Sequence, residues 1–114
     1  MERIRERYLR DPLPIRLGGI AANLARICSC SEHDGLRDVV ESILNESKYF
    51  IEWMAPESDF EIQVEVVELQ IQLALWQNIF DCIWSEPTSR QAFATQAGWW
   101  SHRLLEKSGL LDER

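Results

Sequence analysis

The sequence has few cysteines and no signal-peptide pattern, so it lacks the two features expected of a secreted, disulfide-linked domain. Three cysteines are present among 114 residues, together with five glycines and four prolines. An odd number of cysteines does not suit a disulfide framework and favours reduced thiols. The first residues are rich in arginine and lack the apolar segment and small-residue cleavage site of a signal peptide. We therefore expect a cytoplasmic protein.

Long uninterrupted apolar runs are also missing. The most apolar stretch, residues 64–84, is interrupted by charged and amide side chains, namely Glu65, Glu68, Gln70, Gln72 and Asp81. A membrane-spanning helix needs about 20 consecutive, predominantly apolar residues. The sequence therefore predicts no membrane span.

Basic residues are in the minority and are concentrated at one end. The net charge is −7 at pH 7. Residues 1–16 hold five arginines against three acidic residues, a net charge of +2, and residues 17–114 therefore carry −9. An acidic surface repels phosphates and anionic lipids, so nucleic acid and membranes are unfavourable partners. The arginine-rich start could contact a phosphate or an acidic partner, although a frayed, solvated end is the simpler interpretation.

Motifs of the common enzyme classes are absent. The sequence has no glycine-rich phosphate loop, no His-Glu-x-x-His and no Glu-x-x-His pair of the kind found in di-iron helical proteins. Glu65 and Glu68 are three residues apart, but they fall between apolar stripes, and we interpret them as a solvated face. We therefore expect no catalytic residue, no cofactor and no resident metal.

One short segment does combine potential metal ligands. Cys28-Ser-Cys30-Ser-Glu-His33 places two thiols and an imidazole within six residues, and Cys82 and His102 could complete a set. This spacing is not that of a structural zinc site, and the second half of a usual ligand pair is missing. A buried Cys28 beside an exposed Cys30 and His33 is the favoured interpretation, and a metal-binding protein is a remote alternative.

A second remote alternative is a HEPN-like ribonuclease. Arg26 and His33 are separated by six residues, which resembles the Arg-x4-6-His motif of HEPN-type helical ribonucleases. The two residues lie between the first two expected helices and not near the last one, where that family has its motif. The acidic character of the chain also suits RNA poorly.

What the sequence does contain is the periodicity of four helices. Apolar residues recur at helical spacing in four segments, which are residues 14–28, 35–54, 59–84 and 86–108. Short polar connections imply that neighbouring helices are antiparallel. The prediction is one all-α domain, residues 1–114, folded as an up-and-down four-helix bundle with a long central third helix. Residues 1–13 are expected to form a basic, partly extended N-terminal arm.

Helix boundaries follow from proline, glycine and capping residues. Ser58 and Glu61 have the spacing of a capping box at the start of the third helix. Pro87 suits the first turn of the fourth helix, and Gly109 suits a left-handed C-cap after which Leu110 could pack against Leu105.

The third segment is unusual because it carries two apolar stripes. The first consists of Ile62, Val66, Leu69, Leu73, Trp76, Phe80 and Ile83, and the second of Phe60, Val64, Val67, Ile71 and Leu75. Apolar and polar residues alternate in places as they do in a strand, but the phase changes at Val66-Val67, so we favour a helix. One stripe suffices to join a bundle. The second is either covered by other parts of this chain or is a homodimer face.

Five tryptophans raise two further possibilities. Adjacent residues cannot share a helix face, so we expect Trp99 to point outward beside Trp100. Trp84 and Trp99 are predicted to extend the interface formed by the second stripe. The alternative is a small-molecule or chromophore pocket between the third and fourth helices, lined by Trp76, Phe80 and Trp100.

Two stretches, Tyr8-Leu-Arg-Asp-Pro-Leu-Pro-Ile-Arg-Leu-Gly-Gly and Val67-Glu-Leu-Gln-Ile-Gln-Leu-Ala-Leu-Trp, resemble a family of small uncharacterised helical proteins of cyanobacteria. The resemblance implies a cytoplasmic location and no known activity, so it supplies no functional residue. The leading hypothesis from the sequence is a non-catalytic protein that works through protein–protein contact. We expect a homodimer formed through the third helix, with a further protein partner that the sequence does not identify.

Overall fold

The computed structural model describes residues 2–109, and every regular element within them is helical. The elements are α1 (Glu2–Arg10), α2 (Leu13–Cys30), η1 (Asp34–Leu36), α3 (Arg37–Met54), η2 (Ala55–Glu57), α4 (Phe60–Asn78), α5 (Phe80–Ser85) and α6 (Pro87–Ser108). Here η1 and η2 are single turns of 3-10 helix. The predicted all-α class is confirmed, but this part of the chain forms six α-helices instead of four.

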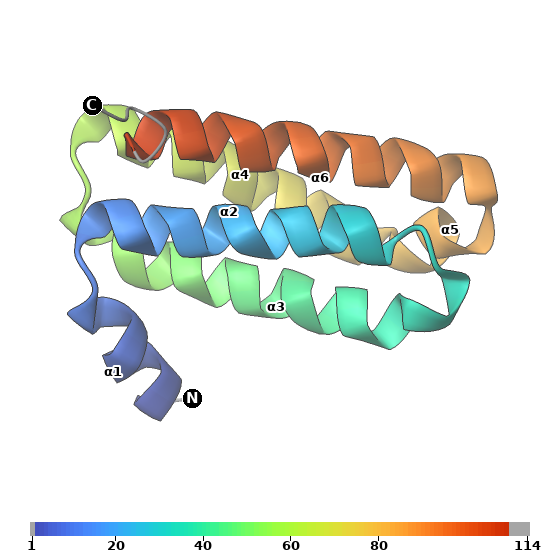
Figure 1. The fold of residues 1–114 in the computed structure, drawn as a ribbon, viewed down its shortest axis with the longest axis horizontal. Coiled ribbons are helices and arrows are strands. Elements are labelled where there is room, and N and C mark those ends of the chain that lie inside the picture. Colours follow the sequence, from blue (N-terminus) through green and yellow to red (C-terminus); the bar gives the residue numbers. More distant parts are fainter. Residues whose placement is uncertain (1, 110–114) are drawn as a thin grey trace.

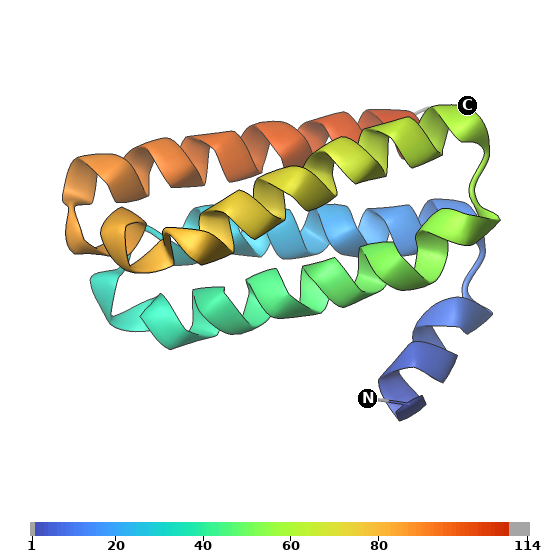
Figure 2. The ribbon, with the colours of Figure 1, turned by 180° about the vertical axis from the view of Figure 1, so that it is seen from behind.

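Four long helices, α2, α3, α4 and α6, lie side by side, and each runs opposite to the preceding long helix (Figure 1). Seen from behind, α4 crosses obliquely in front of α6 and α2 (Figure 2). The short α5 lies at the end where α6 begins, whereas α1 packs against α3 at the opposite end. No helix in residues 2–109 is both long and apolar enough to span a membrane.

Helices α2 and α6 approach each other closely because small side chains lie between them. Ser101 Oγ donates a 2.7 Å hydrogen bond to the carbonyl oxygen of Ala21. A Cβ atom added at Gly98 would lie 3.3 Å from Cys28 Sγ, so the glycine leaves room for the thiol. These two contacts fix the separation between α2 and α6.

The predicted third helix is broken near its end. The chain leaves regular helical geometry at Ile79, whose φ and ψ are −113° and 22°, and resumes as α5. Neither proline nor glycine marks this position. The change of direction allows Phe80 and Trp84 to enter the core, where both are less than 10% exposed. Burial of these two aromatic rings compensates for the interrupted helix.

The N-terminal segment is a helix and not the partly extended arm that the sequence suggested. Tyr8 of α1 stacks on Phe50 of α3 with ring centroids 4.1 Å apart. The buried Arg16 side chain donates to the carbonyl oxygens of Leu9 and Asp11 and to Glu57 in η2, at 3.1, 2.8 and 2.7 Å. Because Arg16 of α2 satisfies carbonyl groups at the end of α1, it fixes that helix to α2 and η2.

The helix caps differ in part from the predicted ones. The N-cap of α4 is Asp59, whose side chain accepts a 3.0 Å hydrogen bond from the Ile62 amide. Ser58, the predicted cap, instead donates to the carbonyl oxygen of Met54. Gly109 ends α6 with φ of 80°, as expected for a left-handed C-cap. The contact predicted for Leu110 lies outside the described residues.

Candidate interaction surface

The outer face of α4 is an exposed apolar ridge. The structure places the whole second stripe in contact with solvent, with exposed fractions of 79% for Phe60, 44% for Val64, 46% for Val67, 58% for Ile71 and 55% for Leu75. Ile79, immediately after α4, is 48% exposed. These six residues, hereafter the α4 ridge, make up six of the eleven large apolar side chains that are exposed in residues 2–109. A continuous exposed apolar strip of this kind is typical of an interaction site.

The inner face of the same helix carries the first stripe and is buried. Val66, Leu69 and Leu73 are fully inaccessible, and Trp76 is 4% exposed. Ile62, nearer the start of the helix, is partly buried. One helix therefore contributes one face to the core, and no part of the described chain covers the opposite face.

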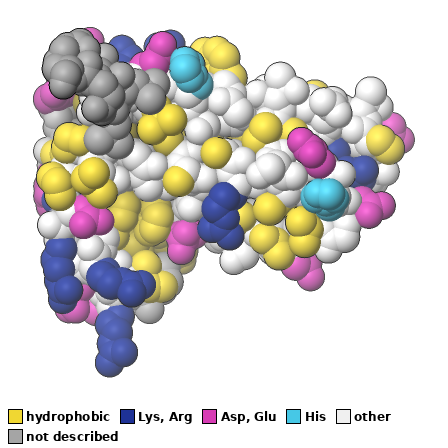
Figure 3. All heavy atoms as spheres, viewed as in Figure 1, with side chains coloured by type: hydrophobic (Ala, Val, Ile, Leu, Met, Phe, Trp, Pro, Cys, Tyr) yellow, Lys and Arg dark blue, Asp and Glu magenta, His cyan; other side chains and the backbone are white. Residues whose placement is uncertain are grey.

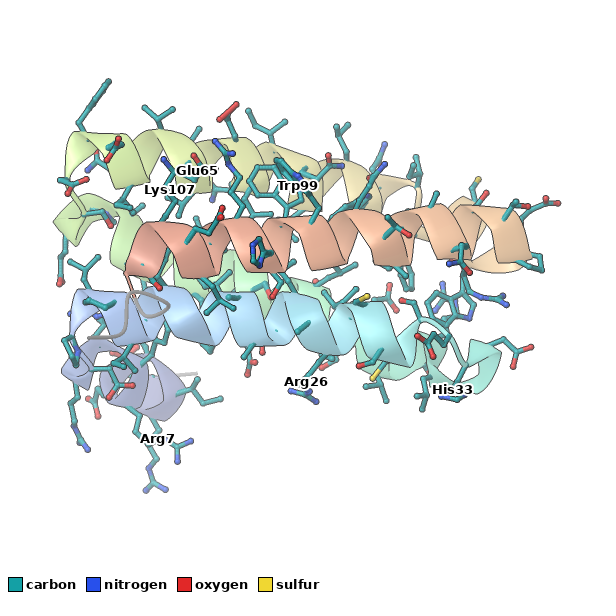
Figure 4. The ribbon with its side chains drawn as sticks, turned by 45° about the horizontal axis from the view of Figure 1, so that its top comes forward. Arg7, Arg26, His33, Glu65, Trp99 and Lys107 are labelled. Atoms are coloured by element: carbon teal, nitrogen blue, oxygen red, sulfur yellow. The ribbon has the colours of Figure 1, made fainter. Side chains whose placement is uncertain are left out.

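An acidic flank borders the α4 ridge on the side of α6. Glu61 and Glu68 are exposed there. Glu65, which was expected to be solvated, is 5% exposed and forms an ion pair with Arg103 of α6. Hydrogen bonding to Glu65 raises the pKa of Arg103. Figure 4 shows Glu65 directed from α4 toward α6. The prediction of a solvated face thus holds for Glu68 and is wrong for Glu65, because α6 approaches α4 at this point.

Trp99 of α6 extends the apolar surface along this flank. It is 55% exposed, whereas Trp100 is partly buried. The guanidinium carbon of Arg103 lies 5.4 Å from the centroid of the Trp99 ring. Arg103 therefore holds this ring through a cation–π contact while it pairs with Glu65. Trp99 lies on the side of α6 that faces α4 (Figure 4).

An amide flank borders the α4 ridge on the side of α3. Gln63, Gln70 and Gln77 follow one another along this side, and Gln77 donates to Asn45 of α3. Tyr49, one turn further along α3 than Asn45, is 44% exposed. The ridge thus has a charged border on one side and an uncharged border on the other.

Trp84 does not belong to this surface. It is 7% exposed, and its indole nitrogen donates a 2.9 Å hydrogen bond to the carbonyl oxygen of Asp34. The guanidinium carbon of Arg90 lies 5.5 Å from its ring centroid. The break at Ile79 turns Trp84 into the core. This could not be predicted from residues 59–84 as one straight helix.

The aromatic side chains of the alternative ligand pocket take part in core packing. Trp76 and Phe80 are 4% and 2% exposed, and their ring centroids lie 4.9 and 6.2 Å from that of Phe93. Trp100 lies further along α6, in edge-to-face contact with Trp99 at 5.1 Å. Trp76 and Phe80 thus pack against Phe93 in the core, whereas Trp100 packs against Trp99, and the predicted pocket stays a prediction.

The potential metal ligands do not form a cluster in the described residues. Cys28 and Cys30 are partly buried, Cys82 is exposed, and all three thiols are free. In residues 2–109, no group of three or more His, Cys, Asp or Glu side chains is arranged to hold a metal ion. Arg26 and His33 are both exposed and point into solvent at separate positions (Figure 4).

Exposed arginines on α1 form a second surface. The sequence predicted a basic N-terminal segment but not this arrangement. Arg3, Arg7 and Arg10 follow the spacing i, i+4, i+7 and project from the same side of the helix. Basic side chains gather over α1 in the space-filling view (Figure 3). The anchoring role of Arg16 was missed, because nothing in the local sequence distinguishes it from the other arginines.

The fold and this surface define a class: an all-helical protein with one long exposed apolar helix face, in which the described residues form no cluster arranged to hold a metal ion. Comparison of the chain with protein-family models, curated proteins and solved structures finds no match.

Proposed function

We propose that this protein is a non-catalytic interaction protein in which the α4 ridge binds a second copy of the chain. The observation that carries the proposal is the exposure of five large apolar side chains along one helix, and of Ile79 directly after it, with no charged side chain among them. Their spacing of four, three, four and four residues from Phe60 to Leu75 is typical of helices that pair along one face. A two-fold dimer is the commonest way to cover such a face.

The energy available from the α4 ridge alone is modest. Burying a large apolar side chain completely contributes about 1.5–3 kcal/mol, so each half-exposed ridge residue contributes about 1 kcal/mol. Two copies together gain roughly 12 kcal/mol, which is offset by an association cost of about 4–15 kcal/mol. Flanking side chains must therefore take part, and the exposed Trp99 and Tyr49 on either side of α4 are suited to this.

The size of the surface leads to the same conclusion. Helix α4 has 19 residues and is about 28 Å long. A stable interface buries about 800 Å² on each partner, which is more than one helix face of this length provides. The proposed interface therefore includes parts of α3 and α6.

A second copy is favoured over nucleic acid or a membrane because of charge. Residues 17–114 carry −9, and the border of the ridge toward α6 is itself acidic. Such a surface repels polyanions, whereas the uncharged apolar ridges of two copies can pack together without charge repulsion. We further propose that the dimer acts in the cytoplasm, which suits its three free thiols, and that it presents its remaining surface to another protein.

Light scattering over a dilution series tests the proposal. The wild-type chain is expected to approach twice 13.3 kDa at high concentration. Ile71→Glu places a charge in the middle of the ridge and should shift the dimer toward monomer by at least about 100-fold in Kd, because a charge buried without a partner costs several kcal/mol. Circular dichroism should show that the variant remains helical.

Ile15→Glu is the matched control. Ile15 is 45% exposed on α2, so the same substitution is made at a similar exposure but away from α4. This variant should dimerise like the wild type. A wild-type chain that stays monomeric at high concentration, or equal weakening by the two variants, would contradict the proposal.

A further inference from the structure

The asymmetry of the two flanks determines how two α4 helices can pair, provided that the proposed dimer forms. A two-fold axis that relates two facing helices lies in the plane between them. If the axis is parallel to the helices, the pair is parallel, and each flank faces the opposite flank of the partner. If the axis is perpendicular to the helices, the pair is antiparallel, and each flank faces its own equivalent.

The flanks differ in charge. On the side of α6, Glu61, Glu65 and Glu68 of α4 lie beside Arg103 and Lys107 of α6, so three carboxylates face two cations and this flank keeps one net negative charge. Gln63, Gln70 and Gln77 on the side of α3 carry no charge. Antiparallel pairing therefore brings the acidic flanks of both copies together, and like charges at such positions are unfavourable. Parallel pairing places each acidic flank against an amide flank, whose side chains can donate hydrogen bonds to carboxylates.

We infer that the two copies pair with their α4 helices parallel. In this arrangement each ridge residue lies next to the same residue of the other copy. The same symmetry brings the α6 side of one copy, with its exposed Trp99, toward the α3 side of the other, with its exposed Tyr49. An aromatic side chain from each flank thus meets the partner at the border of the interface.

The helix dipoles do not oppose this arrangement. Two isolated parallel helices bring like dipole ends together, which is slightly unfavourable. Helices α3 and α6 run opposite to α4 in the same molecule, so they offset its dipole (Figure 2). The flank charges therefore determine the orientation.

Disulfide trapping of variants that each carry one added cysteine tests the inference; the partly buried Cys28 and Cys30 are kept. The background is Cys82→Ser, which removes the exposed native thiol, and the two variants on it are Val64→Cys and Leu75→Cys. Bridged Cα atoms must lie within about 7 Å, whereas residues 64 and 75 are about 16 Å apart along a helix. Parallel pairing predicts that each variant alone forms a covalent dimer under mild oxidation. The Cys82→Ser background alone should form none.

Antiparallel pairing gives a different pattern. A helix pair of that kind can bring only one position next to its own copy, so the two variants could not both form covalent dimers alone. With the two-fold axis near the middle of the ridge, between residues 69 and 70, a mixture of the two variants would instead give the mixed disulfide between positions 64 and 75. That pattern overturns the inference while leaving the proposed dimer intact, whereas a wild-type monomer in light scattering removes the proposed dimer itself.

A charge substitution provides a second, independent test. Gln70→Lys places a lysine on the amide flank, where parallel pairing sets it against the acidic flank of the other copy. The dimer Kd should fall by about threefold to tenfold at low ionic strength, and the gain should disappear in high salt. Antiparallel pairing would place lysine against lysine, so a weaker dimer would overturn the inference.

Discussion

The two faces of α4 have nearly the same side chains and opposite environments. Leu69 and Leu73 on the inner face are fully buried, whereas Ile71 and Leu75, two residues further along in each case, are more than half exposed. The difference comes from the neighbouring helices, since α2, α3 and α6 cover only one side of α4. An apolar helix face is therefore expected to pack against another surface, but its sequence does not show whether that surface belongs to the same chain or to another one.

Substitution on the inner face is expected to have the largest effect. Leu69→Ala should lower the free energy of unfolding by about 2–5 kcal/mol, because it removes buried contacts and leaves a cavity. Ile71→Ala should lower it by less than about 1 kcal/mol, because the side chain is already half in water. Urea unfolding at concentrations where the chain is monomeric measures both values. Equal losses would show that the two faces do not differ in solution.

The ion pair at the border between the two faces should have the next largest effect. Arg103→Met leaves the carboxylate of Glu65 buried without its partner, and the free energy of unfolding should fall by about 2 kcal/mol. Arg37→Met is the matched control, because Arg37 pairs with the exposed Asp81 and should change stability by less than about 0.5 kcal/mol. Chemical denaturation compares the two. Losses of the same size would mean that burial of Glu65 has no energetic consequence.

Tyr8 extends the comparison to α1. Its contribution to the free energy of unfolding is smaller and depends on pH. Burial raises the pKa of Tyr8 above its ordinary value of 10.0. The unfolded chain therefore loses this proton first, so the contribution of Tyr8 to stability is complete below pH 10 and declines as the pH rises beyond it. Thermal melts from about pH 8 to about pH 11 should show a steeper decline for the wild type than for Tyr8→Phe. Parallel curves would show that Tyr8 is solvated.

Much of the helical pattern could be predicted from local sequence, because amphipathic periodicity depends only on residue spacing. The burial of the first stripe was predicted correctly from Val66 in α4 to Ile83 in α5, as was the outward position of Trp99. The break at Ile79 was missed because it has no local signal and exists to bury Phe80 and Trp84. The anchoring of α1 was missed for a related reason, since it depends on contacts of Arg16 with groups up to 41 residues away.

The sequence by itself determined that the described chain is helical, that its charge is acidic, and that one helix has two apolar faces. Only the tertiary structure decided which of these faces is buried, which glutamate is paired, and which tryptophan reaches the surface. The physical reason is that periodicity fixes the direction of a side chain relative to its own helix axis. Burial depends instead on the position of the neighbouring helices, and distant residues such as Ser101, Gly98 and Arg16 set that position.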